Sequence, residues 1–167
     1  MNAPQDHERF QSLLNGHKGI VYKVCRSWCP NPDDREDLAQ EIITQLWLSF
    51  GRFDERGRFS TWMYRIALNV AISFYRREST RRRHVISNVK GVLDVADDSI
   101  AQSEEIRLLY QFIGKLDEWN KALVLLYLDG NTYQEIADVL GISQTNVATK
   151  IGRLKHSMKQ ELSGSRG

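Results

Sequence analysis

The stretch from Phe59 to Arg77, FSTWMYRIALNVAISFYRR, decides the fold because it is long enough for about four or five helical turns and contains neither Gly nor Pro. We expect Ser60 or Thr61 to cap this helix, since either hydroxyl can accept a hydrogen bond from a first-turn amide. Helical spacing predicts one apolar stripe facing a core, formed by Met63, Ile66, Ala67, Val70 and Phe74.

A second face of the same predicted helix carries polar groups. It combines an aromatic plane, two guanidinium groups, an amide and a hydroxyl, from Trp62, Arg65, Asn69, Ser73 and Arg76. On a helix these five side chains fall within about one quadrant. The mixture suits unstacked bases and phosphates. The alternative is an amphipathic helix whose basic face is simply solvated.

Composition limits the classes of protein that fit. A chain of 167 residues suffices for one ordinary domain or two small helical ones, and 41% apolar content permits compact cores. Net charge is only +2, so no field of the whole molecule attracts nucleic acid. The charges are segregated, however, with arginines following Phe74 and acidic stretches at 33–41 and 94–105.

No targeting, membrane or metal signal is evident. The N-terminus lacks the apolar core of a signal peptide, and the longest apolar run, 122–128, is too short to span a bilayer. We therefore expect a soluble, cytoplasmic protein. Cys25 and Cys29 do not have the usual spacing of a zinc or redox motif, so we expect two reduced, partly buried cysteines. No metal or cofactor is expected.

Before the opening stretch, the pattern predicts two helices over residues 7–29, or one interrupted near Gly16. After CPNPDD, a helix reading REDLAQEIITQLWLSF is predicted, capped by Asp33 or Asp34. Its expected buried side comprises Leu38, Ile42, Ile43, Leu46, Trp47 and Phe50. The residues expected on its other side are Asp37, Gln40, Glu41, Thr44 and Leu48.

The segment from Arg81 changes from basic to acidic and shows no sustained helical period until Glu104, so residues 81–103 are interpreted as a linker. Asp117 is expected to cap a helix that ends at Gly130. Thr132 and Glu135 then form a capping box. Gly141 permits a tight turn, and Ser143 caps a second helix.

Helix, glycine turn and helix make a helix-turn-helix pattern. If the apolar series of the second helix faces inward, polar side chains that can reach base edges and phosphates face outward. They are Thr145, Asn146, Thr149, Lys150 and Arg153, with His156 beyond them. The alternative is a helical hairpin that binds no DNA.

Three stretches carry a further signal, and in chain order they read DREDLAQEIITQLW, FSTWMYRIALNVAISFYRR and LDGNTYQEIADVLGISQTNVATKIGRLK. Together they closely resemble bacterial sigma factors of the extracytoplasmic-function (ECF) type, in the sigma-70 family. The resemblance spans most of the chain. It implies an all-α fold of two small helical domains, the second a helix-turn-helix. The implied divisions are a region 2-like domain at 1–80, a linker at 81–103 and a region 4-like domain at 104–167.

The resemblance also implies roles. The acidic helix would dock on core RNA polymerase through Asp37, Gln40, Glu41 and Thr44. The helix with Asn69 would recognise and help open the promoter −10 element, where Asn69 matches a position that meets a flipped-out base. The helix with Arg153 would bind the −35 element as duplex, and the linker would thread towards the polymerase active-site cleft. An anti-sigma protein is a further expected partner.

Two residues depart from the family pattern: Ala148 replaces a frequent basic residue, and Gly152 replaces a frequent bulky one. These leave the −35 sequence and affinity open. No catalytic constellation is present, so we do not expect an enzyme. The alternatives are a stand-alone helix-turn-helix regulator whose first domain binds a signal or protein, and a nucleic-acid enzyme such as a recombinase.

Overall fold

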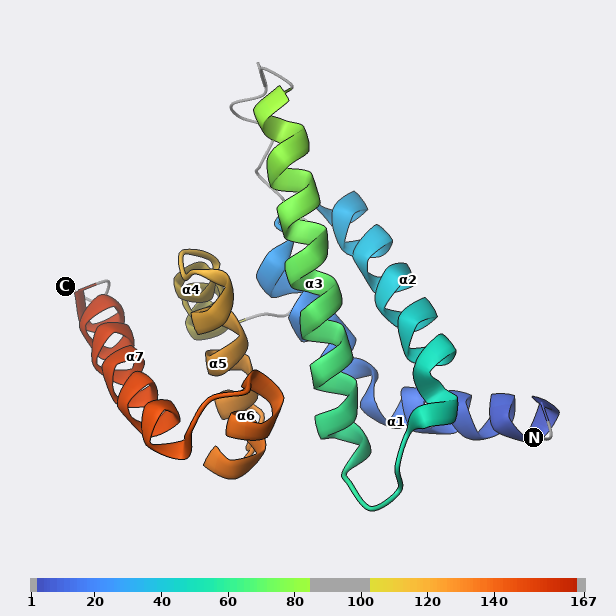
Figure 1. Cartoon of the computed structure of the whole chain (residues 1–167). Coiled ribbons are helices and arrows are strands. Elements are labelled where there is room, and N and C mark those ends of the chain that lie inside the picture. The colour runs from blue at the N-terminus through green and yellow to red at the C-terminus, as the bar shows by residue number, and fades with distance from the viewer. Residues whose placement is uncertain (1–2, 85–102, 165–167) are drawn as a thin grey trace. The chain divides into compact units, whose positions relative to one another are not determined.

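The computed structural model describes residues 3–84 and 103–164, and these residues form helices joined by turns and short loops (Figure 1). The chain divides into two compact units, Met1–Asn88 and Val89–Gly167. This confirms the expected all-α class with two small helical domains. Within the described ranges, no helix is both long and apolar enough to cross a membrane.

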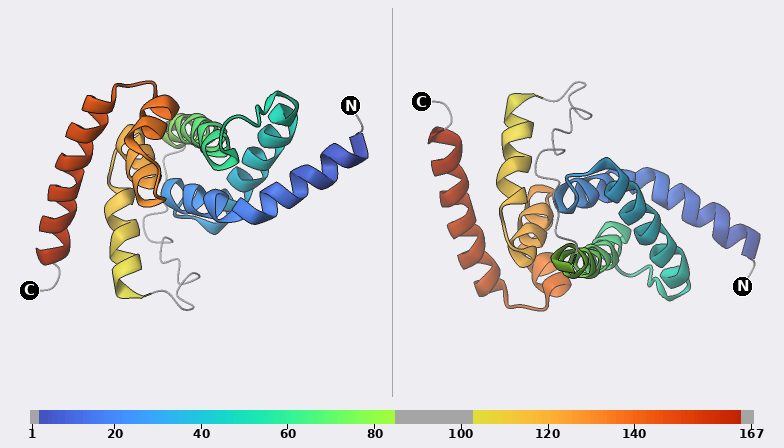
Figure 2. Two further views of the ribbon diagram at one scale, coloured as in Figure 1. Left: turned by 90° about the horizontal axis from the view of Figure 1, so that it is seen from below. Right: turned by 90° about the horizontal axis from the view of Figure 1, so that it is seen from above.

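The first unit contains α1 (Ala3–Trp28), α2 (Pro32–Ser49), the short 3-10 helix η1 (Phe50–Arg52) and α3 (Phe59–His84). Each of the three long helices contacts the other two. Figure 2 shows α3 nearly end-on beside α1 and α2. Their shared core holds side chains with no exposed surface, which are Val24, Leu38, Ile42, Leu46, Met63, Tyr64, Ala67 and Ala71.

The buried face of α3 is wider than the predicted stripe. Met63, Ala67 and Phe74 are buried as expected, whereas Ile66 and Val70 are only half-buried. Three residues outside the predicted stripe are also buried, namely Tyr64, Leu68 and Ala71. The reason is that α3 packs against both α1 and α2, so two sides of the helix are covered rather than one.

The first helix is continuous, which corrects the predicted interruption near Gly16. A glycine inside a helix costs about 1 kcal/mol relative to alanine. Packing outweighs this cost because α1 buries side chains on both sides of Gly16, with Phe10 before it and Ile20, Val21 and Val24 after it.

Two predicted caps are wrong. The N-cap of α2 is Asn31, whose side chain accepts a hydrogen bond from the Asp33 amide at 2.8 Å, so Asp33 lies in the first turn and does not cap. In α3 the first turn begins at Phe59, and the Trp62 amide donates to the Arg58 carbonyl at 3.2 Å. Ser60 and Thr61 therefore lie inside the helix. In both places the chain enters the helix earlier than its polar residues suggest.

The apolar side of α2 is narrower than predicted. Leu38, Ile42 and Leu46 are fully buried and Phe50 is 7% exposed, as expected. Ile43 and Trp47 are 37% and 39% exposed, contrary to expectation. Trp47 packs against Phe10 of α1, with ring centroids 5.2 Å apart, yet much of its side chain stays at the surface, as does that of Ile43.

The second unit contains α4 (Glu104–Gly114), α5 (Glu118–Leu128), α6 (Tyr133–Leu140) and α7 (Gln144–Gly164). The middle of α5 is buried from Lys121 to Leu126, and α5, α6 and α7 contact one another. The core around α5 thus positions the helix-turn-helix pair α6 and α7.

The local signals of the second unit are confirmed. Asp117 caps α5 by accepting from the Asn120 amide at 2.8 Å. Thr132 and Glu135 form both hydrogen bonds of a capping box at the start of α6. Gly141 has φ of 69°, in the left-handed region that favours glycine, and it ends α6. Ser143 accepts from the Asn146 amide at 3.1 Å, which caps α7.

The first four residues of the predicted linker at 81–103 are helical, since α3 continues to His84. Because α1 and α2 hold the core-facing residues of α3, the helix can continue past its last buried residue even where the sequence has no apolar periodicity. The acidic half of the predicted linker, and with it the proposed path towards the polymerase cleft, lies outside the described residues.

Candidate nucleic-acid interface

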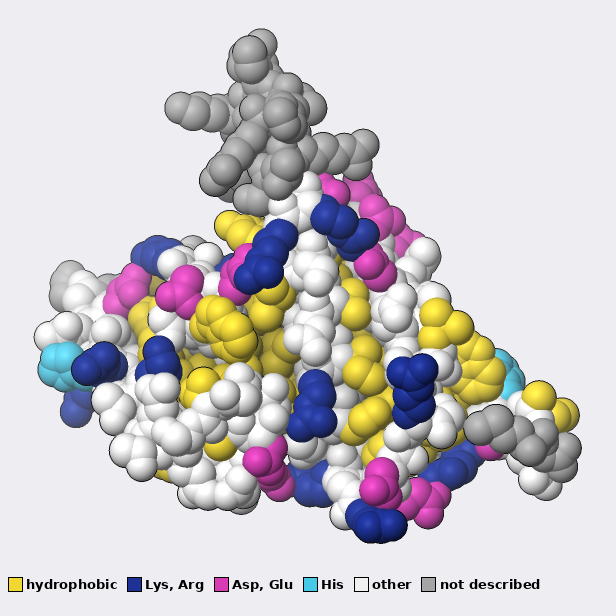
Figure 3. All heavy atoms as spheres, in the orientation of Figure 1, with side chains coloured by type: hydrophobic (Ala, Val, Ile, Leu, Met, Phe, Trp, Pro, Cys, Tyr) yellow, Lys and Arg dark blue, Asp and Glu magenta, His cyan; other side chains and the backbone are white. Residues whose placement is uncertain are grey.

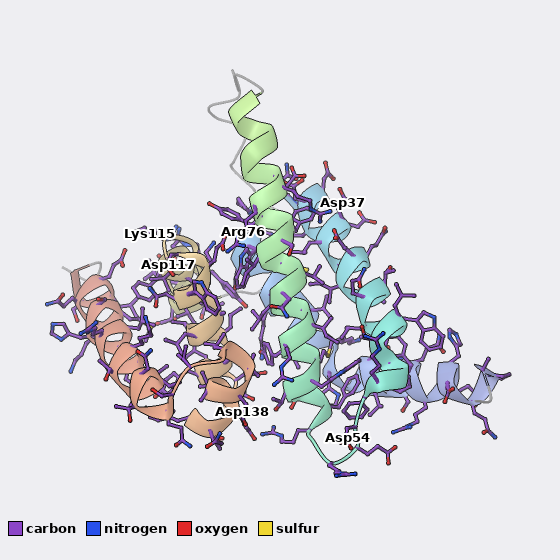
Figure 4. All side chains as sticks on the ribbon, viewed as in Figure 1. Asp37, Asp54, Arg76, Lys115, Asp117 and Asp138 are labelled. Atoms are coloured by element: carbon purple, nitrogen blue, oxygen red, sulfur yellow. The ribbon has the colours of Figure 1, made fainter. Side chains whose placement is uncertain are left out.

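The polar stripe of α3 is at the surface. Arg65, Asn69, Ser73 and Arg76 are all exposed, and Arg76 projects from α3 in Figure 4. Figure 3 shows Lys and Arg side chains spaced along the face that α3 lines. The buried face of α3 holds the helix against α1 and α2, so these groups are presented on a supported element. An amide flanked by guanidinium groups can hydrogen-bond a base edge and hold adjacent phosphates.

Trp62 differs from the other four members of the stripe because it is half-buried. Its ring centroid lies 5.2 Å from that of Phe53, 5.4 Å from that of Phe59 and 6.3 Å from that of Phe50. These separations are typical of aromatic pairs that stabilise one another. The cluster fixes the orientation of Trp62 and leaves only part of its surface for stacking.

The predicted polymerase-facing residues share the outer side of α2. Asp37, Gln40 and Thr44 are exposed, and Asp37 projects from α2 in Figure 4. The Thr44 hydroxyl donates to the Gln40 carbonyl at 2.8 Å, so its proton is used within the helix. Glu41 is half-buried and pairs with Arg77 of α3 through its carboxylate.

Apolar side chains extend this outer side of α2 towards the C-terminal end of the helix. Leu48 is 69% exposed, and Ile43 and Trp47, one turn apart on α2, are each more than a third exposed. Sequence reasoning placed Leu48 on this side but assigned Ile43 and Trp47 to the core. A row of exposed apolar residues next to acidic and amide groups is typical of a protein-binding surface.

The outward face of α7 carries the predicted duplex-binding groups. Thr145, Asn146, Thr149 and Arg153 are exposed, and Lys150 is half-buried. Val147 is fully buried and Ile151 is 2% exposed, so the opposite face anchors the helix in its own unit. The Thr149 hydroxyl donates to the Thr145 carbonyl at 3.0 Å, which leaves its oxygen lone pairs and methyl group for a ligand.

The two departures from the family pattern, Ala148 and Gly152, both lie at the surface of α7. A Cβ added at Gly152 would meet no atom within 4 Å among those described. Close packing within the unit therefore does not require glycine at this position.

The two cysteines are buried in the first unit and form no disulfide with each other, so they are more deeply buried than the sequence predicts. Burial, followed by the nearby Cys29, raises the pKa of Cys25 to about 12. A thiol with such a pKa stays protonated at neutral pH and is a poor nucleophile or metal ligand. In the described part of the chain, no group of three or more His, Cys, Asp or Glu side chains could hold a metal ion.

Comparison with protein families assigns both units. Residues 13–81 match the family described as Sigma-70 region 2, and residues 106–157 match the family described as Sigma-70, region 4. The first match contains α2 and the polar stripe of α3, and the second contains α6 and the first two thirds of α7.

Curated relatives match along nearly the whole chain. The ECF RNA polymerase sigma factor SigW of Bacillus subtilis is 27% identical over 169 aligned positions, covering 94% of this chain and 90% of SigW. The RNA polymerase sigma factor CnrH of Cupriavidus metallidurans is 26% identical, covering 92% of this chain and 86% of CnrH.

Solved structures share the fold. CnrH in complex with the cytosolic domain of CnrY superposes with a TM-score of 0.68 at 23% identity, covering 95% of this chain and 90% of CnrH. The sigma factor RpoE, in complex with the anti-sigma factor NepR from Bartonella quintana, gives a TM-score of 0.72 at 20% identity. That match covers 92% of this chain and 95% of RpoE.

Proposed function

The chain belongs to the sigma-70 family, as a promoter-recognising ECF sigma factor for transcription initiation, and we propose that its helical units divide this work between two promoter elements. Residues 1–80 bind core RNA polymerase and recognise the −10 element. Residues 104–167 recognise the −35 element, and residues 81–103 connect them. The chain directs the polymerase and performs no catalysis itself.

The observation that carries the proposal is the exposed polar stripe of α3, whose opposite face packs against α1 and α2. Melting a promoter requires groups that bind unpaired bases better than paired ones, because extruding a base costs a few kcal/mol. The Asn69 side chain offers both donors and acceptors for a base edge. Arg65 and Arg76 lie along the same exposed stripe and can hold the adjacent backbone.

The outer side of α2 is the proposed polymerase contact. Its polar groups are Asp37, Gln40, Glu41 and Thr44, and its exposed apolar residues include Trp47 and Leu48. Protein interfaces combine an apolar centre with a polar rim, and this surface offers both on one helix. Binding to polymerase would cover the apolar residues that the fold leaves exposed.

The helix α7 is the proposed −35 contact. Its exposed side chains enter the major groove, where Thr145, Asn146 and Thr149 approach base edges. Lys150 and Arg153 add positive charge along the same helix, which strengthens contact with phosphates.

We also propose an anti-sigma protein as a partner. The solved RpoE structure contains the anti-sigma factor NepR, and the CnrH structure contains the cytosolic domain of CnrY. A protein that covers the outer side of α2 or the exposed face of α7 would block promoter recognition. A sigma factor acts on cytoplasmic polymerase, so we place this chain in the cytoplasm.

The test combines the purified chain with core RNA polymerase and a pool of genomic DNA fragments. We expect selective transcription from a subset of fragments that core polymerase alone does not transcribe. The chain without polymerase should not select these fragments. Selective binding of palindromic sites by a dimer of the chain alone, with no effect on polymerase, would instead support the stand-alone regulator.

A further inference from the structure

Three exposed polar side chains form one hydrogen-bonded series where α6 meets α7. Gln144 is the first residue of α7, and its Nε2 donates to Oε1 of Gln134 near the start of α6. The Nε2 of Gln134 donates in turn to Oδ1 of Asp138 at 2.8 Å. Asp138 lies one turn further along α6 and is labelled in Figure 4. Sequence analysis assigned no role to any of these three residues.

The carboxylate of Asp138 determines which way both amides point. A carboxylate accepts hydrogen bonds and donates none, so it must face the amide nitrogen of Gln134. The carbonyl oxygen of Gln134 then faces Gln144. Because that oxygen also only accepts, Gln144 must present its own amide nitrogen. The series therefore holds Gln144 in one of its two possible amide orientations.

The remaining polar atoms of Gln144 match one base. After its bond to Gln134, the Gln144 amide keeps one N–H and its carbonyl oxygen. In the major groove, adenine presents an acceptor at N7 beside a donor at N6, and a glutamine amide can bind both at once. Guanine presents two acceptors there, and cytosine presents a donor, so neither offers the same pair.

We propose that Gln144 is a specificity-determining residue that recognises an adenine in the −35 element, and that Gln134 and Asp138 are positioning residues for it. This inference rests on the proposed docking of α7 in duplex DNA. Gln144 precedes Thr145, which is exposed at the end of α7 that enters the groove first in a helix-turn-helix. Orienting a flexible side chain before binding lowers the entropy lost in the complex.

The experiment uses holoenzyme reconstituted from the full chain and core RNA polymerase. Its DNA is a promoter selected by the wild-type holoenzyme, with the −10 element kept and the −35 element randomised. Sequencing the bound fraction gives the base preference at each position. We expect the wild-type chain to prefer adenine at one position, and Gln144→Ala to reduce that preference about tenfold. Gln160→Ala, an exposed glutamine further along α7, is the matched control and should change nothing.

Two further variants test the orientation. Gln144→Glu removes the donor for adenine N7 and should move the preference at that position away from adenine. Asp138→Asn lets the Gln134 amide turn over and should relax the preference at the same position. The double variant Gln134→Glu with Asp138→Asn should restore it. The amide introduced on α6 can then donate to the new carboxylate, which still accepts from Gln144.

The outcomes distinguish a failure of the Gln144 assignment from a failure of the proposed −35 function. If the wild-type holoenzyme selects no upstream base, the proposed −35 role of residues 104–167 fails. If it selects bases and Gln144→Ala leaves the adenine preference unchanged, the assignment of Gln144 is wrong. An equal loss of binding to all sequences would also overturn the assignment. An unchanged preference in Asp138→Asn would overturn the positioning role.

Discussion

The guanidinium of Arg77 on α3 donates from Nη2 to both carboxylate oxygens of Glu41 on α2, at 2.7 and 2.9 Å. The Arg77 guanidinium carbon also lies 5.9 Å from the centre of the Phe74 ring. This contact links the helix proposed to bind polymerase with the helix proposed to bind the −10 element. Glu41 therefore has a role inside the fold in addition to its proposed place in the polymerase interface.

The pair predicts different effects for Asp37 and Glu41, two of the acidic residues of α2. Asp37→Lys should weaken assembly with core polymerase while leaving the free energy of unfolding unchanged, because Asp37 is exposed. Glu41→Lys should weaken assembly and also lower the free energy of unfolding by about 1 kcal/mol, because it removes a partly exposed ion pair and places two cations together. Binding assays with core polymerase and urea unfolding curves measure the two effects. Unchanged affinity in both folded variants would contradict the assignment of α2.

The charge swap Glu41→Arg with Arg77→Glu isolates the contact between the helices. It should recover the stability that Glu41→Arg alone loses, because the opposite charges meet again. Polymerase affinity should stay low, since the interface would still carry the wrong charge. A double variant no more stable than the single one would show that the pair contributes nothing to the packing of α2 on α3.

Arg153 should contribute to −35 binding. If its guanidinium binds guanine, Arg153→Ala should lose about 1–3 kcal/mol of discrimination at one position. If it binds a phosphate, affinity should fall for all sequences alike. The slope of log affinity against log salt concentration should also become shallower by about one. Holoenzyme binding to promoter variants at several salt concentrations distinguishes the two. If Arg153→Ala has the affinity, sequence preference and salt slope of the wild type, Arg153 does not contact the −35 DNA.

Gly152→Ala should stabilise the second unit by up to about 1 kcal/mol, because alanine is the better helix former and a Cβ has open space there. Gly141→Ala is the matched control and should destabilise the unit, since Gly141 has φ of 69°. Thermal unfolding of both variants measures the difference. A Gly152→Ala variant less stable than the wild type would show that its glycine serves the local fold.

The buried thiol of Cys25 predicts a pH dependence. Burial raises its pKa from 9.0 to about 12, so the folded state holds the proton more tightly than the unfolded state. The resulting stability is complete below pH 9 and is lost as the pH rises towards 12. Unfolding free energies across this range should decline less steeply in Cys25→Ala than in the wild type. In the native protein the thiol should resist alkylation at pH 8, and rapid labelling would contradict its burial.

Local signals were the most predictable part of the fold. The capping box of Thr132 and Glu135, the glycine turn at Gly141 and the cap at Ser143 each depend on residues within one turn of one another. Their chemistry could therefore be recognised from spacing alone. The outward face of α7 could also be predicted from the sequence. The cap at Ser143 defines where the helix begins, and Val147 and Ile151 lie on its buried side.

Features that depend on how helices cross were not predictable. Nothing in the spacing of Glu41 and Arg77, or of Gln134 and Gln144, indicates that their side chains meet. Likewise, the hydrophobicity of Trp47 suggests burial but does not distinguish a core from a binding surface. The half-buried state of Trp62 has the same origin, since its aromatic neighbours Phe50 and Phe53 come from η1 and the residue that follows it.

The central claim is that the stripe of α3 opens the promoter, and Asn69 tests it most directly. Permanganate footprinting and transcription compare Asn69→Ala with the wild type on a duplex promoter and on the same promoter melted beforehand. Asn15→Ala, an exposed amide on α1, serves as the control. We predict slower melting of the duplex, an altered preference at one −10 position, near-normal transcription from the melted template and unchanged polymerase affinity. Equal loss of activity on both templates, with unaltered base preference and lower thermal stability, would show that Asn69 is structural and would contradict the account.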